Sequence, residues 1–368
     1  MPPRSRARAA SNASATPATD SLRGKAAATT LAMASAPAVK PAASLSPLLT
    51  HTADKIPSAL RFPILVLLSY AVGLIAHQLV ALFAGSADLR AVSRHFEDPW
   101  LIAAALIWRI AELAVGWFTQ LDARDALYLT LLTHLPQTYL LHTFYLVPIS
   151  STLTTLLISA LSTYAPFRLF LTRPYSRPYA FTTAFLPLQV YVTLLASAVY
   201  ALPLLLSLTT WLPTHLILHF DGLRTLDPAH DANLAILVSL MLPTGFLASR
   251  FLFDPLASPA LAAAEQLVKQ AGPDDGVETA GTSFDPVTAT LVETLAWNLL
   301  WWRRYSPRGR ELVRRMLLLV IGTGACAGMK AWAEVKGVDA QGAVGWAAVW
   351  IVGAGASGGV LGWVGDAW

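Results

Sequence analysis

The sequence carries very little charge, since Asp, Glu, Lys and Arg together make up 13% of its 368 residues. Soluble domains carry about 25% charged residues, because a folded chain needs a charged exterior to stay in water. Hydrophobic residues make up 55% of this chain and occur in long blocks. This composition excludes an ordinary soluble domain and predicts an all-α protein, a polytopic bundle of transmembrane helices.

The sequence also has a single cysteine and lacks the common catalytic motifs. The one cysteine, Cys326, lies in an apolar run, where it forms no disulfide within the chain and is typical of a packed core residue. Walker A, GxSxG and histidine-box motifs are absent, and no cofactor is predicted. Gly353, Gly355 and Gly358 match G-x-G-x-x-G, but they lie within an apolar span and lack a strand–turn–helix setting. These absences favour a protein that is not an enzyme.

Positive charge is concentrated in a tail at residues 1–57. The tail has seven basic residues and two acids, so the rest of the chain sums to −1 within the formal net charge of +4. Its Ala, Ser, Thr and Pro content without apolar periodicity predicts disorder, and no nucleic-acid-binding face is expected. An Arg-bearing, acid-poor segment also fits a mitochondrial transit peptide. The endoplasmic reticulum membrane is favoured, and the mitochondrial inner membrane is the alternative.

Eight apolar stretches are each about 20 residues long, the length that a helix needs to cross a bilayer. They lie near 62–84, 100–119, 127–147, 149–171, 180–206, 233–253, 314–333 and 342–364. Loops rich in Lys and Arg fall on one side in an eight-span topology with both termini cytoplasmic; Arg90 and Arg94 are the exception. The chain therefore divides into a six-span region at 58–253 and a glycine-rich transmembrane hairpin at 314–368.

Between these regions lies the largest predicted cytoplasmic loop, residues 254–313. Leu291, Leu295 and Leu299 recur in it at helical spacing, and Trp302 and arginines follow. An apolar stripe that ends in Trp and Arg is typical of an amphipathic helix lying in the membrane interface. The alternative is that these residues form the first turns of the next span.

Arg109 and Glu112 lie near the middle of the second predicted span. Their spacing of three places them on one face of a helix. An ionised side chain at mid-bilayer costs roughly 3 kcal/mol or more, so it must pair with an opposite charge or reach a wet cavity. Two interpretations stay open. The pair is either a binding site for an ion, a proton or an anionic group, or a structural ion pair that fixes helix packing.

Polar residues on two other spans extend this candidate site. His77 in the first span lies at a depth similar to that of Arg109 in the antiparallel second span. His134 and Gln137 share one face of the third span, the most polar of the eight. A helix of this kind should face the bundle interior. The sequence therefore predicts one intramembrane polar site built from Arg109, Glu112, His77, His134 and Gln137.

Two weaker patterns concern metal binding and association. His215 and His219 are four residues apart with Asp221 close behind, a set that can bind zinc but lacks a supporting motif. Small residues four apart also let helix backbones approach closely. Two such pairs are Gly324 with Gly328 and Gly355 with Gly359. The glycines predict either a tight hairpin or a contact with a second copy or a membrane partner.

Three stretches resemble a family of uncharacterised filamentous-fungal multi-pass membrane proteins. They read TWLPTHLILHFDG, FDPVTATLVETLAWNLLWW and GWAAVWIVGAGASGGVLGWVGD. The resemblance covers about residues 59–368. It implies an integral membrane protein and brings no activity, cofactor or site residues.

Three functions therefore stay open. A non-enzymatic membrane assembly or scaffold factor is favoured, acting through the 254–313 loop and the glycine-rich hairpin. A transporter or channel would use the site of Arg109, Glu112 and the histidines. A membrane-embedded metal enzyme would use the His215, His219 and Asp221 cluster.

Overall fold

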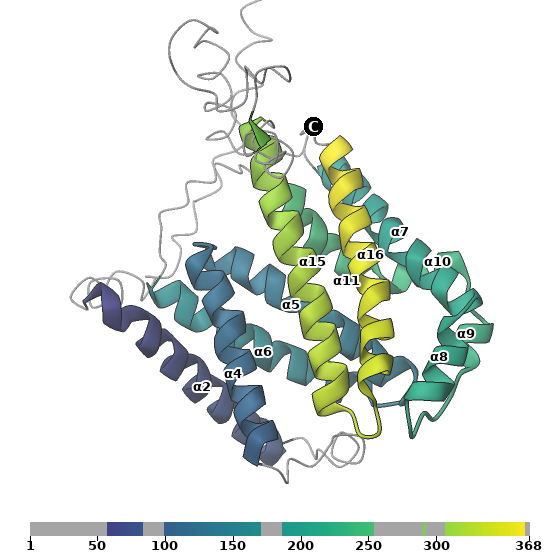
Figure 1. Cartoon of the computed structure of the whole chain (residues 1–368), viewed down its shortest axis with the longest axis horizontal. Coiled ribbons are helices and arrows are strands. Elements are labelled where there is room, and N and C mark those ends of the chain that lie inside the picture. Colours follow the sequence, from purple (N-terminus) through teal and green to yellow (C-terminus); the bar gives the residue numbers. More distant parts are fainter. Residues whose placement is uncertain (1–56, 84–98, 171–185, 254–289, 292–305, 365–368) are drawn as a thin grey trace, which may run out of the picture. The chain divides into compact units, whose positions relative to one another are not determined.

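The computed structural model describes residues 57–83, 99–170, 186–253, 290–291 and 306–364. Within these ranges every regular element is a helix, and Phe220 and Val338 form an isolated antiparallel bridge. The longer helices are α2 (Ser58–Phe83), α4 (Pro99–Phe118), α5 (Ala123–Thr143), α6 (Ile149–Phe170), α7 (Leu186–Thr209), α15 (Pro307–Glu334) and α16 (Ala340–Val364) (Figure 1). The shorter ones are α8 (Leu212–His219), α9 (Asp227–His230), α10 (Leu234–Leu240), α11 (Leu242–Ala248) and the π-helical turn η1 (Ser249–Phe253). The all-α prediction is confirmed.

Five of the described helices are long and apolar enough to cross a membrane: α2, α6, α7, α15 and α16. Helices α10 and α11 bring the number to six if they form one bent span. The exposed side chains agree with a lipid environment, since Leu67, Leu74 and Leu82 on α2 are 68%, 63% and 78% exposed. A soluble protein rarely exposes so much contiguous apolar surface. The chain is an integral membrane protein.

Hydropathy placed the ends of most spans within a few residues. The main difference lies at α15, which begins at Pro307 and not near residue 314. Ser306 caps this helix by accepting a hydrogen bond from the Gly309 backbone N–H at 3.1 Å, and Pro307 suits the first helical turn. Residues 307–313 are therefore helix and not loop. The proposed interfacial helix near Leu291–Trp302 lies almost wholly outside the described residues.

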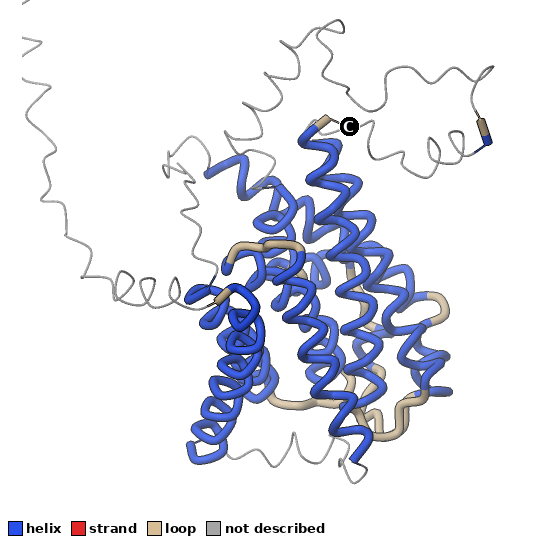
Figure 2. The backbone as a smooth tube through the Cα atoms, turned by 60° about the vertical axis from the view of Figure 1, so that its left-hand side comes forward, coloured by secondary structure: helices blue, strands red, loops and turns tan. Residues whose placement is uncertain are grey.

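The helices around the candidate site pack against one another in a continuous series (Figures 1 and 2). Helix α2 packs against α6, and α6 packs against α5. Helix α15 packs against both α5 and α16, and α16 packs against α7. Helix α5 thus has neighbours on several sides. This explains how a span with so many polar residues is accommodated, because its polar face meets protein instead of lipid.

Three of the four glycines singled out in the sequence lie at the contact between α15 and α16, the two helices of the C-terminal hairpin. A Cβ atom on Gly324 would lie 2.5 Å from Ile351 Cδ1 on α16, and a Cβ on Gly328 would lie 3.7 Å from the Ala347 Cβ. A Cβ on Gly355 would lie 3.8 Å from Val320 on α15, whereas one on Gly359 would meet nothing within 4 Å. The geometry supports the tight hairpin, and contact with a partner stays a prediction.

Helices α10 and α11 meet at a bend of 55°. Gly245 on α11 lies directly against α7, where an added Cβ atom would fall 2.6 Å from both the Ser197 backbone N and the Thr193 backbone O. Backbone atoms of a packed helix cannot move aside as a flexible side chain can. The close approach of α11 to α7 therefore requires glycine at this position.

We expect Gly245→Ala to lower the free energy of unfolding by about 1–3 kcal/mol, the usual cost of overpacking. Gly355→Ala is the matched control, because its Cβ would make only an ordinary contact and alanine favours helix by about 1 kcal/mol over glycine. The measurement is denaturant unfolding of both variants in detergent micelles. Equal stability of the two variants would contradict the packing of α11 on α7.

A buried ion cluster ties the start of α15 to two other elements. Arg315 Nη2 donates to Asp125 Oδ2 on α5 at 2.7 Å, and Arg315 Nε donates to Glu311 Oε1 at 2.7 Å. A third bond runs from Nη1 to the Phe251 backbone O of η1 at 3.1 Å. Arg315 is 5% exposed and Asp125 is 1% exposed. Arg315 is therefore a buried link between α5, η1 and α15.

Candidate functional site: a polar cavity between the helices

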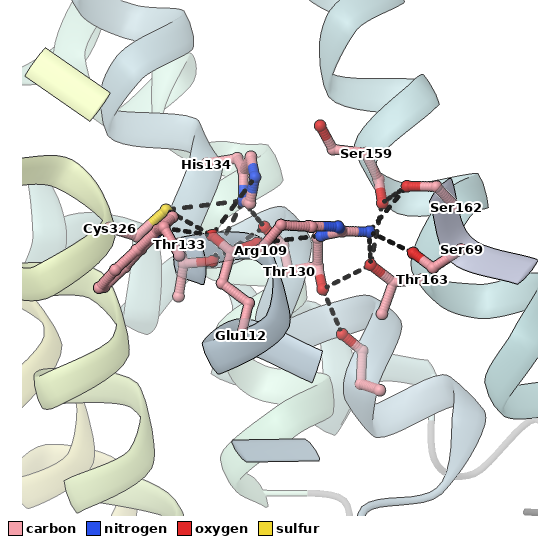
Figure 3. Close-up of polar contacts among 12 residues, drawn as sticks. Ser69, Arg109, Glu112, Thr130, Thr133, His134, Ser159, Ser162, Thr163 and Cys326 are labelled. Atoms are coloured by element: carbon pink, nitrogen blue, oxygen red, sulfur yellow. Dashed lines mark hydrogen bonds and ion pairs between the residues drawn. The ribbon is translucent and has the colours of Figure 1, made fainter. Parts of the chain in front are cut away.

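Arg109 and Glu112 form the predicted ion pair. Arg109 Nη1 donates to Glu112 Oε2 at 2.9 Å (Figure 3), and the two side chains are 17% and 19% exposed. One turn of α4 sets this distance because residues three apart lie on the same face of a helix. Pairing reduces the cost of holding two charges within an apolar span.

The other guanidinium nitrogen connects α4 to two neighbouring helices. Arg109 Nη2 donates to Ser69 Oγ on α2 at 3.2 Å, and to Ser162 Oγ and Thr163 Oγ1 on α6 at 2.7 and 2.9 Å. Figure 3 shows the side chain extending from Glu112 toward these three hydroxyls. The guanidinium is therefore occupied by protein groups. This arrangement favours the structural interpretation of Arg109 over an anion-binding role.

Glu112 has three further polar neighbours on its other side. Its Oε1 accepts a hydrogen bond from Trp108 Nε1 at 2.9 Å and lies 3.5 Å from Cys326 Sγ on α15. His134 Nε2 on α5 lies 4.0 Å from the same oxygen. The carboxylate thus lies where α4, α5 and α15 meet. Together with Arg109, it joins five helices in one polar network.

The hydrogen bonds of His134 define the tautomer of its ring. Nδ1 lies 2.8 Å from the Thr130 backbone O, and a carbonyl oxygen only accepts, so Nδ1 carries the proton. In a neutral imidazole, Nε2 then holds a free lone pair. His134 is 6% exposed, and its Nε2 lies on the side of Glu112. The ring therefore offers an acceptor or metal ligand to this part of the site.

A cavity of about 270 Å³ reaches this network. A second cavity of about 430 Å³ shares several of its lining residues. The residues common to both are His77, Ala105, His134, Ser159, Lys330 and Glu334. The first cavity also includes Arg109 and Glu112, and the second includes Gln137 and Thr155. All five residues of the predicted polar site therefore line these two adjoining cavities, which we together call the central cavity.

Gln137 has the least satisfied side chain in the central cavity. It is 6% exposed, and neither its Oε1 nor its Nε2 has a hydrogen-bond partner among the described residues. A buried amide without partners costs roughly 1–3 kcal/mol. Gln137 lines the central cavity, so its unpartnered donor and acceptor lie beside the space that water or a bound polar molecule would occupy.

Sequence reasoning missed two charged residues of the cavity. Lys330 Nζ donates to Glu334 Oε1 at 2.8 Å on the last turns of α15. The spacing of four between Lys330 and Glu334 is typical of a helical ion pair. The four charged residues of the central cavity, Arg109, Glu112, Lys330 and Glu334, sum to zero.

The predicted metal set of His215, His219 and Asp221 has a different arrangement. His219 Nδ1 pairs with Asp339 Oδ2 at 2.8 Å, and the His215 and His219 rings lie 4.6 Å apart. Asp221 instead makes backbone contacts, with its N–H donating to Gly337 O at 3.0 Å. The pKa of Asp339 lies below its ordinary value because its carboxylate accepts hydrogen bonds from the Gly342 N–H and from His219. Asp339, distant in sequence, is thus the carboxylate partner of His219.

Within the described part of the chain, one group of residues brings metal-ligand atoms together. Glu112, His134 and Cys326 each place one such atom within 4.8 Å of the other two. His215, His219 and Asp221 do not meet this condition although all three are described. A candidate metal centre therefore lies between α4, α5 and α15 and not at α8.

Comparison with known proteins adds no assignment, because the chain matches no protein-family model, no curated protein and no solved structure. The resemblance to fungal membrane proteins therefore stays a prediction. Any function has to be argued from the geometry of the site.

Proposed function

We propose that this chain is a membrane transport protein that binds a small neutral or zwitterionic solute in the central cavity. The observation that carries the proposal is the buried, unpartnered amide of Gln137, a residue that lines a polar cavity within an apolar bundle. A purely structural bundle would gain stability by filling this space with apolar side chains. The volume of about 430 Å³ lies in the range of roughly 300–1,000 Å³ that small-molecule sites occupy.

The charges of the cavity support a solute without net charge. Arg109 is paired with Glu112, and Lys330 is paired with Glu334. A site whose fixed charges cancel gives no electrostatic preference for either sign of ion. Gln137, Thr155 and Ser159 provide neutral donors and acceptors along the wall. Such groups suit a molecule that both donates and accepts hydrogen bonds.

Eight spans with both termini cytoplasmic are the topology that we propose for this transporter. Helix α4 has 20 residues and α5 has 21, so each is long enough to cross a bilayer. Helix α5 does not need to be strongly apolar, because His134 and Gln137 are covered by other helices. The C-terminal end of α15, with Lys330 and Glu334, then lies on the outer side. The cavity would open there, in the endoplasmic reticulum or, alternatively, the mitochondrial inner membrane.

Water access to the cavity is the first test of the proposal. In a Cys326→Ser background, Ser159→Cys should react with a membrane-impermeant methanethiosulfonate reagent, because Ser159 lines the central cavity. Leu157→Cys is the matched control, two residues away on α6 and 57% exposed on the lipid-facing surface. Thiols react as thiolates, which require water. An unreactive Ser159→Cys in folded protein would show the cavity to be dry and would overturn the proposal.

Solute flux is the second test. Proteoliposomes that contain the protein should swell faster than empty vesicles in stopped-flow light scattering with urea, glycerol or glycine as the test solute. We expect Gln137→Leu to reduce this rate about tenfold, because one hydrogen bond to a polar solute contributes roughly 1–1.5 kcal/mol. Gln189→Leu on α7 makes the same chemical change outside the central cavity and should leave the rate unchanged. A wet cavity without any flux would favour the membrane-assembly role instead.

A further inference from the structure

The cluster of Cys326, His134 and Glu112 combines a soft and an intermediate metal ligand inside the membrane bundle. The Cys326 Sγ atom lies 3.5 Å from Glu112 Oε1, the His134 Nε2 atom lies 4.0 Å from the same oxygen, and the three residues each place one ligand atom within 4.8 Å of the other two. A metal ion that binds sulfur at about 2.3 Å and nitrogen at about 2.0 Å holds these atoms no more than about 4.3 Å apart. We propose that Cys326 and His134 bind a soft monovalent metal ion, Cu(I), with Glu112 beside it. This inference goes beyond the proposed transport function and does not depend on it.

The surroundings of His134 match those of a metal-binding histidine. Such residues usually donate their second ring N–H to a carbonyl or carboxylate, which fixes the tautomer and orients the ring. His134 Nδ1 makes this bond with the Thr130 backbone O at 2.8 Å. The Nε2 lone pair is thereby left for a ligand, on the side where Glu112 Oε1 lies 4.0 Å away. The outer-shell contact that a metal ligand requires is thus already in place.

The net charge of the site favours a monovalent ion over a divalent one. When Cu(I) binds, the Cys326 thiol releases its proton and the sulfur forms a bond to copper. The Cu⁺ ion thus replaces H⁺ on the sulfur, the net charge of the site is unchanged, and no electron is transferred. A zinc ion would instead add one uncompensated positive charge near Arg109, because the Glu112 carboxylate is already paired with the Arg109 guanidinium. Excess charge in a low-dielectric interior is costly. Thiolate and imidazole ligands also suit Cu(I).

An ion can reach the cluster from the central cavity. The cavity of about 270 Å³ is lined by both Glu112 and His134, whereas Cys326 lies behind them and is 2% exposed. In Figure 3 the sulfur lies on one side of Glu112, and the serine and threonine hydroxyls that contact Arg109 lie on the other side. The carboxylate and imidazole therefore form the entrance and the thiol forms the closed end.

The test is an anaerobic titration of the full-length protein in detergent with Cu(I), in competition with the chromophoric chelator bicinchoninate. Wild type should bind one equivalent and develop ultraviolet thiolate-to-copper charge-transfer absorption. Cys326→Ser and His134→Gln should each weaken binding by at least about 100-fold, more than the 10–100-fold typical of outer-shell changes. His215→Asn, which removes an imidazole outside the cluster, should bind as wild type does.

Two further measurements keep the result decisive. Size-exclusion profiles and unfolding midpoints of Cys326→Ser and Cys326→Ala show whether loss of copper reflects loss of fold. X-ray absorption of the copper-loaded protein should find one sulfur ligand. The proposal fails if folded wild type binds no Cu(I), if either cluster variant retains full affinity, or if equimolar Zn²⁺ displaces the copper. Copper binding without solute flux would leave this inference standing and would overturn only the transport proposal.

Discussion

Replacing Arg315 by methionine should lower the free energy of unfolding by about 3–5 kcal/mol, because it breaks a buried ion cluster from one side. Arg315 bonds to Asp125 on α5, Glu311 on α15 and the Phe251 backbone O of η1. Its guanidinium also lies 5.2 Å from the centre of the Phe251 ring. Removing it leaves the nearly inaccessible Asp125 carboxylate without its guanidinium partner. The measurement is denaturant unfolding in detergent micelles.

Arg314→Met is the matched control, since the neighbouring arginine is 44% exposed and forms its ion pair at the surface. Exposed pairs contribute about 0–1 kcal/mol, so this variant should unfold close to wild type. The double variant Arg315→Met with Asp125→Asn should be more stable than Arg315→Met alone, because the buried charge is then removed as well. Equal losses in Arg314→Met and Arg315→Met would contradict the burial of this cluster.

Hydropathy alone was sufficient to locate the longer helices within the described residues, although it did not predict the short helices α8 and α9. Each predicted span coincides with a helix or, at 233–253, with the bent pair α10 and α11. This works because the hydrocarbon core requires continuous apolar stretches of a known length. The bend at α10 and α11 was not predicted, since hydropathy measures what a segment is made of and not its direction. The count of eight crossings stays a proposal.

The candidate site was predicted in part. The spacing of Arg109 and Glu112 predicted their contact, because helical geometry fixes neighbours three residues apart. The partners on other helices, such as Ser162 and Cys326, depend on how helices pack, and no local pattern encodes that. The same limit explains why the sequence grouped Asp221 with His215 and His219 as a metal set, whereas the carboxylate that pairs with His219 is that of Asp339, 120 residues away.

Arg109→Met should also destabilise the membrane-spanning bundle strongly. The substitution removes the ion pair to Glu112 together with the bonds to Ser69, Ser162 and Thr163. We expect a loss of about 3 kcal/mol in the free energy of unfolding, since Glu112 is left charged and poorly solvated. The stability of Arg109→Lys should fall between that of wild type and that of Arg109→Met. An ammonium keeps the positive charge but lacks the planar guanidinium, which bonds to Glu112 and to the hydroxyls at the same time.

The double variant Arg109→Met with Glu112→Gln separates a structural role from a functional one. If the ion pair mainly holds α4 in place, removing both charges should recover much of the stability that Arg109→Met loses, because no unpaired charge stays in the bilayer. Ile107→Met, on the exposed side of the same helix, should unfold as wild type does. A fully stable Arg109→Met that loses only solute flux would instead place the guanidinium in the binding site. The geometry argues against this outcome, because protein hydroxyls and a carboxylate already surround Arg109.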